Sequence, residues 1–269
     1  MSCAALVLRD DPRLHATALF APAARRDGLF ALYAFDCELS RAVRASRESV
    51  IPRMRLQWWR DTVEDAAEGG AEREHEVAGP LHGVINAEAR TEFVPLLLDL
   101  IEAREQELEA PFGQAAFERW ADLRFGSLFD AASVLVAGTP IGARRPVALA
   151  AGTAFALRTA SAMVHDTLPS LLPDLGQRGR SEIASGKPGE ALFEALAASA
   201  RTAAADLRAS RNTAKSPARR VVPALLPLLW TDRTLRIASH PGFALGQLDD
   251  IDRPFDGLRL LWRAASGRW

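Results

Sequence analysis

The feature that most constrains the fold of this chain is the helical spacing of its apolar residues, which continues along almost the whole sequence. Leu29, Leu32, Tyr33 and Cys37 follow one face of a helix, whereas alternating strand patterns are scarce. We therefore predict an all-α fold of about nine to eleven helices. The expected helices are Arg25–Ser46, Met54–Ala67, Leu81–Ala89, Thr91–Glu109, Phe112–Gly138 (as one helix or two), Pro146–Thr167, Glu190–Arg211, Pro217–Leu229 and Phe255–Ala265. No long linker divides the sequence, so residues 1–269 are expected to form a single domain.

Composition and charge exclude several classes of protein. Hydrophobic residues make up 48% of the chain, and 33 Lys and Arg balance 34 Asp and Glu. A net charge of -1 creates no overall field that would attract nucleic acid, so no nucleic-acid partner is expected. No apolar stretch approaches the roughly 20 residues that span a bilayer, and the start lacks a signal-peptide pattern. We expect a cytoplasmic protein without a transmembrane segment, and peripheral contact with the inner membrane stays open.

Familiar catalytic motifs and metal-ligand spacings are absent from the sequence. Cys3 and Cys37 are its two cysteines, and neither belongs to a CxxC pair or a Cys/His cluster. The chain also lacks a Gly-rich phosphate loop, a GxSxG motif and an HExxH motif. A structural zinc site is therefore not expected.

A polar row interrupts the most apolar of the predicted helices. Asp36, Ser40 and Arg44 are spaced i, i+4 and i+8, so they share one helix face, with Cys37 and Arg41 beside them. The simpler interpretation is a solvated stripe or a structural ion pair. The functional interpretation is the wall of a pocket.

Two segments resemble the squalene/phytoene synthase family: LFALYAF at residues 29–35 and RLQWWRD at residues 55–61. This family consists of all-α enzymes that join two prenyl diphosphates head to head. The resemblance implies an isoprenoid-synthase-like helical bundle around a central cavity. In such enzymes, aspartates spaced i, i+4 on two facing helices hold the Mg²⁺ ions that grip the substrate diphosphate.

The aspartate positions implied by this resemblance do not carry acids. The positions of the first motif fall on Ser40, Arg41 and Arg44, and those of the second fall on Met163 and Thr167. Asp166 is acidic but lies one position out of register. An arginine at such a position places positive charge where Mg²⁺ would lie. We therefore expect no catalytic residue at these degenerate positions, no bound metal and no cofactor.

One branch of the same family lacks the aspartate motifs, and this chain resembles it more closely. The matching segments are FAL at residues 30–32, AF at 34–35, EL at 38–39, RLQWWR at 55–60 and FDGLRLLW at 255–262. The mitochondrial members of that branch act as assembly factors for respiratory complex I, and alphaproteobacteria carry close relatives. The resemblance implies a catalytically degenerate assembly or binding factor with a protein partner, for which complex I subunits are candidates. The apolar segments Val221–Trp230 and Phe255–Trp269 are candidate docking surfaces.

The cavity implied by the resemblance would hold an apolar or isoprenoid ligand. Its expected lining residues are Tyr33, Asp36, Cys37, Ser40, Arg41, Arg44, Trp58, Arg158, His165 and Asp166. The simpler alternative for Trp58 is a role in the core. For His165, the simpler alternative is helix capping or a position on the surface.

The alternative function is an active Mg²⁺-dependent head-to-head prenyl transferase acting on farnesyl or geranylgeranyl diphosphate. Such an enzyme would use displaced acids, namely Asp36, Glu38, Asp61 and Asp65. Asp61 and Asp65 have the DxxxD spacing, but a solvated helix end before Gly69 explains them as well. The run at residues 249–252 resembles a DDxxD motif, although a loop or N-cap before the last helix is the simpler interpretation.

Overall fold

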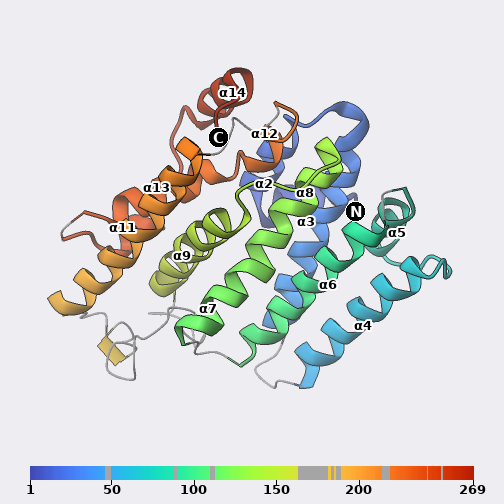
Figure 1. Cartoon of the computed structure of the whole chain (residues 1–269). Helices are drawn as coiled ribbons and strands as arrows, with labels where there is room; N and C mark the ends of the chain where they lie inside the picture. The colour runs from blue at the N-terminus through green and yellow to red at the C-terminus, as the bar shows by residue number, and fades with distance from the viewer. Residues whose placement is uncertain are drawn as a thin grey trace.

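Helices form almost all of the structure, a computed structural model that describes residues 1–45, 50–87, 90–109, 113–162, 181–182, 185, 189–213, 219–240, 242–249 and 251–269. The described residues contain no strand, and the predicted all-α class is confirmed (Figure 1). The N-terminal half contains α1 (Cys3–Asp10), α2 (Pro12–Ala18), α3 (Ala23–Arg44), α4 (Val50–Ala67), α5 (Ala78–Ala87) and α6 (Arg90–Glu107). The remainder contains α7 (Gln114–Ala121), the π-helix η1 (Asp122–Gly126), α8 (Ser127–Ala137), α9 (Arg144–Ala162), α11 (Glu190–Thr213), α12 (Val222–Leu225), α13 (Leu228–Ala238), the 3₁₀-helix η2 (Leu245–Leu248) and α14 (Asp256–Ser266).

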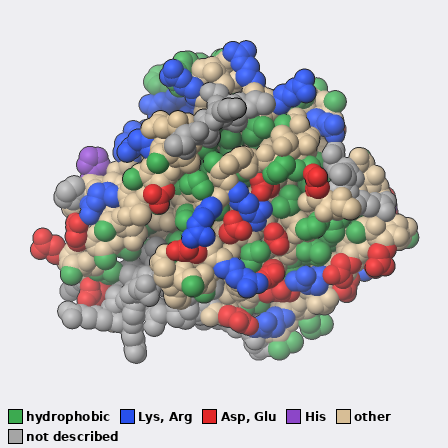
Figure 2. Space-filling model, in the orientation of Figure 1, with side chains coloured by type: hydrophobic (Ala, Val, Ile, Leu, Met, Phe, Trp, Pro, Cys, Tyr) green, Lys and Arg blue, Asp and Glu red, His purple; other side chains and the backbone are tan. Residues whose placement is uncertain are grey.

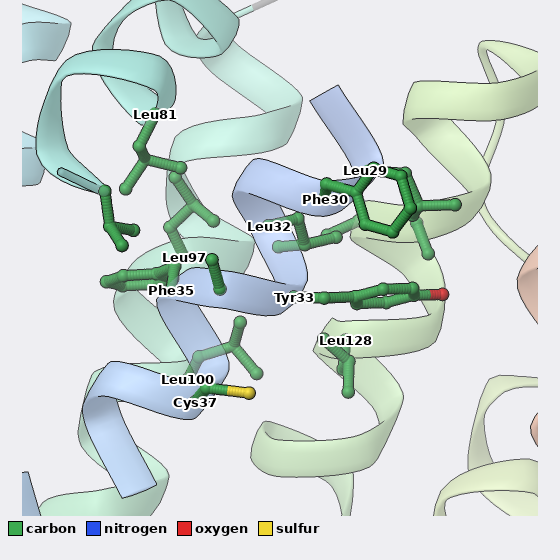
Figure 3. Packing of buried hydrophobic residues seen from close by; sticks show 14 of the residues in the cluster. Leu29, Phe30, Leu32, Tyr33, Phe35, Cys37, Leu81, Leu97, Leu100 and Leu128 are labelled. Atoms are coloured by element: carbon green, nitrogen blue, oxygen red, sulfur yellow. The ribbon is translucent and has the colours of Figure 1, made fainter. Parts of the chain in front are cut away.

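Helix α3 is the centre of the N-terminal half. Helices α1, α4, α5, α6 and α8 all pack on it, so its side chains are buried in nearly every direction between Leu29 and Leu39. Leu97 and Leu100 of α6 lie on one side of it and Leu128 of α8 on another (Figure 3). A helix that is apolar all round is stable only inside a protein. Between Leu29 and Leu39, a polar side chain on α3 therefore faces other helices, whereas Arg25, Asp27 and Arg44 near its ends are exposed.

A second core joins the C-terminal helices. Apolar side chains of α7, α9, α11 and α13 form it, and many of them are alanines. Small residues let the backbones approach closely, and Gly152 of α9 marks the tightest crossing, against Ala121 and Trp120. The face of α9 that points away from this core is thereby held opposite α3 and α6.

Most predicted helices are present, with shifted ends and three differences. Helices α1 and α2 were not expected, because they are short and Pro12 separates them. The expected helix Pro217–Leu229 is divided into α12 and α13, since Pro227 lacks a backbone N–H and starts a new helix. Helix α13 then continues to Ala238. The expected ends at Ser46, Ala89 and Thr167, and the expected starts at Phe112 and Pro217, lie outside the described residues.

Two expectations about exposed segments also change. The described residues of Val221–Trp230 are mostly core, because Leu225, Leu226 and Leu228 are buried, so this segment is not a docking surface. Within the acidic run at residues 249–252, Asp252 is not simply solvated, because it accepts hydrogen bonds from Arg13 and from the Trp230 indole. None of the described helices has the length and apolar character that crossing a membrane requires.

The crossing at Gly152 gives a test of the packing. A Cβ there would lie 2.7 Å from the Cβ of Ala121, so Gly152→Ala should lower the free energy of unfolding by about 1–3 kcal/mol, despite the better helix propensity of alanine. The control is Gly83→Ala on the exposed face of α5, where no atom lies within 4 Å. That variant should gain about 0.5–1 kcal/mol. Urea denaturation measures both, and equal effects would contradict the close crossing.

Candidate functional site

A cavity of about 260 Å³ lies between α3, α6, η1 and α9, with the α1–α2 connection at its edge. Helix α3 supplies the largest share of the wall, because its polar row faces inward here. The lining residues are Asp10, Asp11, Asp36, Cys37, Ser40, Val43, Arg44, Arg104, Glu107, Arg124, Phe155 and Thr159. The cavity therefore has acidic, basic and apolar walls together.

The guanidinium of Arg104 connects the two principal walls of this cavity. Its Nη2 donates to Asp36 Oδ1 at 2.7 Å and to Ser40 Oγ at 2.6 Å on α3. Its Nη1 lies 3.2 Å from both carboxylate oxygens of Glu107, one turn further along α6. The Arg104 side chain is only 3% exposed. Both terminal nitrogens are therefore paired, whereas Nε has no hydrogen-bond partner among the described residues. A buried charge needs such pairing, since desolvation would otherwise destabilise the fold.

The π-helix η1 brings a second arginine into the same network. A π turn inserts one extra residue into a helix and redirects the side chains around it. Here Arg124 donates to Glu107 Oε1 at 2.6 Å, and its guanidinium lies 3.9 Å from the centre of the Phe155 ring on α9. Trp120 donates its indole N–H to the same Glu107 oxygen at 3.0 Å. The carboxylates of both Asp36 and Glu107 are thus hydrogen-bonded to arginine.

Burial and pairing shift the pKa values of this network in opposite directions. Burial would raise the pKa of Glu107, but Arg104 and Arg124 outweigh it and hold that pKa below its ordinary value. For Arg104, burial acts to lower the pKa, whereas Glu107 and Asp36 raise it on balance. Burial, with Arg104 nearby, lowers the pKa of Arg124 to about 10. Arg104, Glu107 and Arg124 therefore stay charged at neutral pH.

Part of the polar row of α3 lines the cavity. Asp36, Cys37, Ser40 and Arg44 line it. Arg41 points elsewhere and forms ion pairs with Asp10 and Glu38, each at 2.5 Å. Asp36 is paired with Arg104, whereas Arg44 makes no ion pair with a residue in the described part of the chain.

The other predicted lining residues lie in different places. Tyr33 is buried in the core, with its hydroxyl bonded to Thr17 (Figure 3). Trp58 lines a separate surface pocket, where its ring contacts that of Trp59 and the guanidinium of Arg73 lies over it.

Arg158 lies on α9 between the lining residues Phe155 and Thr159, and burial lowers its pKa to about 10. Burial also raises the pKa of the nearby Asp11. Four other residues named from the sequence, Met163, His165, Asp166 and Thr167, lie outside the described residues.

Arg104, Glu107 and Arg124 were missed by the sequence analysis. Phe93, Leu97 and Leu100 follow the buried face of α6, and Arg104 continues that spacing four residues later. The available signal was therefore a charged residue at a position where the helical spacing predicts a buried apolar one. Nothing in the sequence around Arg124 indicated a π turn.

The comparisons with known proteins identify the family. The sequence model of the squalene/phytoene synthase family matches residues 8–255. The chain belongs to this family. Its fold matches a crystal structure of a dehydrosqualene synthase in complex with ligand, with a TM-score of 0.73 and 15% identity over 98% of this chain and 94% of that one. It also matches squalene synthase HpnC from Alicyclobacillus acidocaldarius, with a TM-score of 0.65 and 13% identity over 98% and 92%. At these identities the likeness concerns the fold, and no protein of curated function matches the sequence.

The Mg²⁺ that the family uses does not fit the described walls of the cavity. No group of three or more His, Cys, Asp or Glu side chains in the described ranges is arranged to hold a metal ion. Of the displaced acids of the alternative enzyme, Asp36 is paired with Arg104, Glu38 with Arg41 and Asp65 with Arg73, whereas Asp61 accepts a hydrogen bond from the amide of Gln57. Asp61 and Asp65 lie on α4, which contributes no residue to this cavity.

Removing Arg104 should strongly destabilise the protein. Arg104→Met leaves the carboxylates of Asp36 and Glu107 buried without their shared partner, so we expect a loss of about 3–5 kcal/mol in the free energy of unfolding. The matched control is Arg119→Met, which breaks an exposed ion pair with Glu102 and should cost less than about 1 kcal/mol. Urea denaturation at neutral pH measures both. Similar losses in the two variants would contradict a central role for Arg104.

The lowered pKa of Glu107 predicts an acid-dependent stability. A carboxylate with a depressed pKa in the folded state stabilises the protein above its ordinary value of 4.5, and this contribution disappears as the pH falls through the folded value. Glu107→Gln should therefore be less stable at neutral pH and lose less stability on acidification. Glu118→Gln, in an exposed pair with Arg145, should differ little from wild type at any pH. Urea midpoints across the acidic range decide, and parallel curves for wild type and Glu107→Gln would refute the assignment.

Proposed function

We propose that this chain is a catalytically degenerate member of the squalene/phytoene synthase family that acts as a binding or assembly factor. The supporting observation is the position of Arg104. It holds Asp36 and Ser40 on α3 and Glu107 on α6, so the acids on these facing helices bind arginine. A Mg²⁺–diphosphate clamp needs free carboxylate oxygens on such faces.

The ligand we propose for the cavity is an apolar or isoprenoid molecule with an anionic end. Val43, Phe155 and Cys37 supply apolar surface, and Phe155 also packs on Arg124. Arg44 lines the cavity without an ion-pair partner in the described ranges. Arginine can bind a phosphate or carboxylate directly and in bidentate fashion. Such a ligand would need no metal.

The partner we propose is respiratory complex I, and the branch resemblance supports it. The residues that carry this resemblance include the FAL and AF segments on α3 and the RLQWWR segment on α4. In the fold, these residues build the centre of the first core and the outer helix beside it. A binding factor would keep such a scaffold with an altered cavity.

A product assay tests the loss of prenyl transfer. The purified chain is incubated with farnesyl or geranylgeranyl diphosphate and Mg²⁺, with and without NADPH. We expect no squalene, phytoene or presqualene diphosphate, because Asp36 and Glu107 in the cavity are paired with arginine. An active squalene synthase under identical conditions is the positive control. Formation of any of these products that stops in EDTA would overturn the proposal and establish the Mg²⁺-dependent alternative.

A further inference from the structure

The last helix, α14, exposes its most apolar face to solvent. Leu260 and Asp256 on its inner face are buried against the body of the protein. On the opposite face, Leu258, Leu261 and Trp262 are 63%, 56% and 56% exposed. Phe255, at the start of the helix, is 67% exposed. Helix α14 lies at one end of the molecule (Figure 1), where the space-filling view shows apolar side chains at the surface (Figure 2).

The spacing of these residues makes a continuous stripe. Leu258, Leu261, Trp262 and Ala265 occupy positions i, i+3, i+4 and i+7, which share one helix face. Single exposed leucines are common on protein surfaces, but a helix with an apolar stripe turned to water marks an interaction site. Folding alone does not require this stripe, because the opposite face already packs on Leu226, Leu229 and Trp230.

Arginines surround the stripe, and nearby acids are neutralised. Arg259 lies beside it on α14, with its Nη1 3.6 Å from Asp256 Oδ1, and the Arg268 guanidinium lies 5.3 Å from the Trp262 ring. Of the acids, Asp256 is bound by the buried Arg233, and Asp252 by Arg13. Figure 2 shows basic side chains around the apolar groups at this end. The rim of the stripe is therefore cationic.

A pocket of about 390 Å³ beside α14 adds more positive charge. Four arginines line it, with Asp232 as its one carboxylate: Arg208 and Arg211 on α11, Arg236 on α13 and Arg263 on α14. Asp232 already accepts from Arg211 and Arg263. The Arg211 Nε and Arg263 Nη1 groups are buried without a hydrogen-bond partner among the described residues. This excess of donors suits an anion with several oxygens, such as a phosphate.

We propose that α14 docks the protein on the surface of an anionic phospholipid bilayer. The stripe enters the boundary between headgroups and acyl chains, the surrounding arginines contact lipid phosphates, and the pocket binds one headgroup phosphate. Interfacial helices combine such an apolar face with flanking basic residues. Pairing with a second copy is disfavoured, because it would bring two cationic rims together. This docking goes beyond the proposed function and holds whether or not the cavity is catalytic.

Vesicle co-sedimentation tests the docking with the full chain. Phosphatidylcholine vesicles with phosphatidylglycerol should bind the chain about tenfold more strongly than phosphatidylcholine alone, and added salt should weaken this binding. Leu261→Glu and Trp262→Glu should each reduce binding about tenfold. Arg259→Ala should reduce it about fivefold. The matched control is Met54→Glu, a 67% exposed apolar residue on α4, which should bind like wild type.

Several outcomes would overturn the proposal. These are no binding to either vesicle, equal binding to both, unchanged binding of Leu261→Glu, or a dimer that this substitution dissociates. The Arg208→Ala, Arg236→Ala double variant should bind anionic vesicles less well, and unchanged binding refutes the role of the pocket. Calorimetry with inorganic phosphate separates the two sources of anion, since phosphate binding without vesicle binding contradicts membrane docking. Thermal melting verifies that each variant is folded. The outcome of the product assay, which tests the proposed function, does not depend on these results.

Discussion

The cavity depends on one buried interaction, in which Arg104 holds carboxylates from two places at once. Its guanidinium joins Asp36 and Ser40 of α3 to Glu107 of α6, and Glu107 in turn binds Arg124 and Trp120. Buried charges are stable only when their hydrogen bonds are satisfied, so the positions of α3, α6 and η1 are coupled. The same contacts determine the chemistry of the wall, because carboxylates that bind arginine are not available to a metal ion.

Under the proposed function, the chain keeps the family fold without the family chemistry. The chain keeps the helices that surround the cavity, and its fold matches that of a dehydrosqualene synthase over almost its whole length. At the positions that the resemblance assigns to the first aspartate motif, the chain has Ser40, Arg41 and Arg44. Arg41 turns to Asp10 and Glu38, which leaves Arg44 as the cation of α3 that faces the cavity. A fold hosts a function only through the residues of its site.

Much of the fold was predictable, because long apolar helices leave a clear spacing in the sequence. The expected helices Glu190–Arg211 and Phe255–Ala265 agree with α11 and α14 to within about two residues. Short helices such as α1 and the π turn at Arg124 leave no such pattern. The polar row of α3 indicated the cavity wall, but the partner of Asp36 and Ser40 in that row is Arg104 of α6, which is distant in sequence. Pairing between distant helices depends on tertiary packing, so one sequence could not show that Arg104 binds Asp36.

Deleting the gene in its host tests most directly whether this chain acts by binding rather than by prenyl transfer. The measurement is NADH:quinone oxidoreductase activity in membranes, together with the content of squalene-derived and carotenoid lipids. A binding or assembly factor of the complex I type predicts low oxidoreductase activity with unchanged lipids, and recovery when the gene is restored. Normal oxidoreductase activity with altered hopanoid or carotenoid content would contradict it and point to an active synthase.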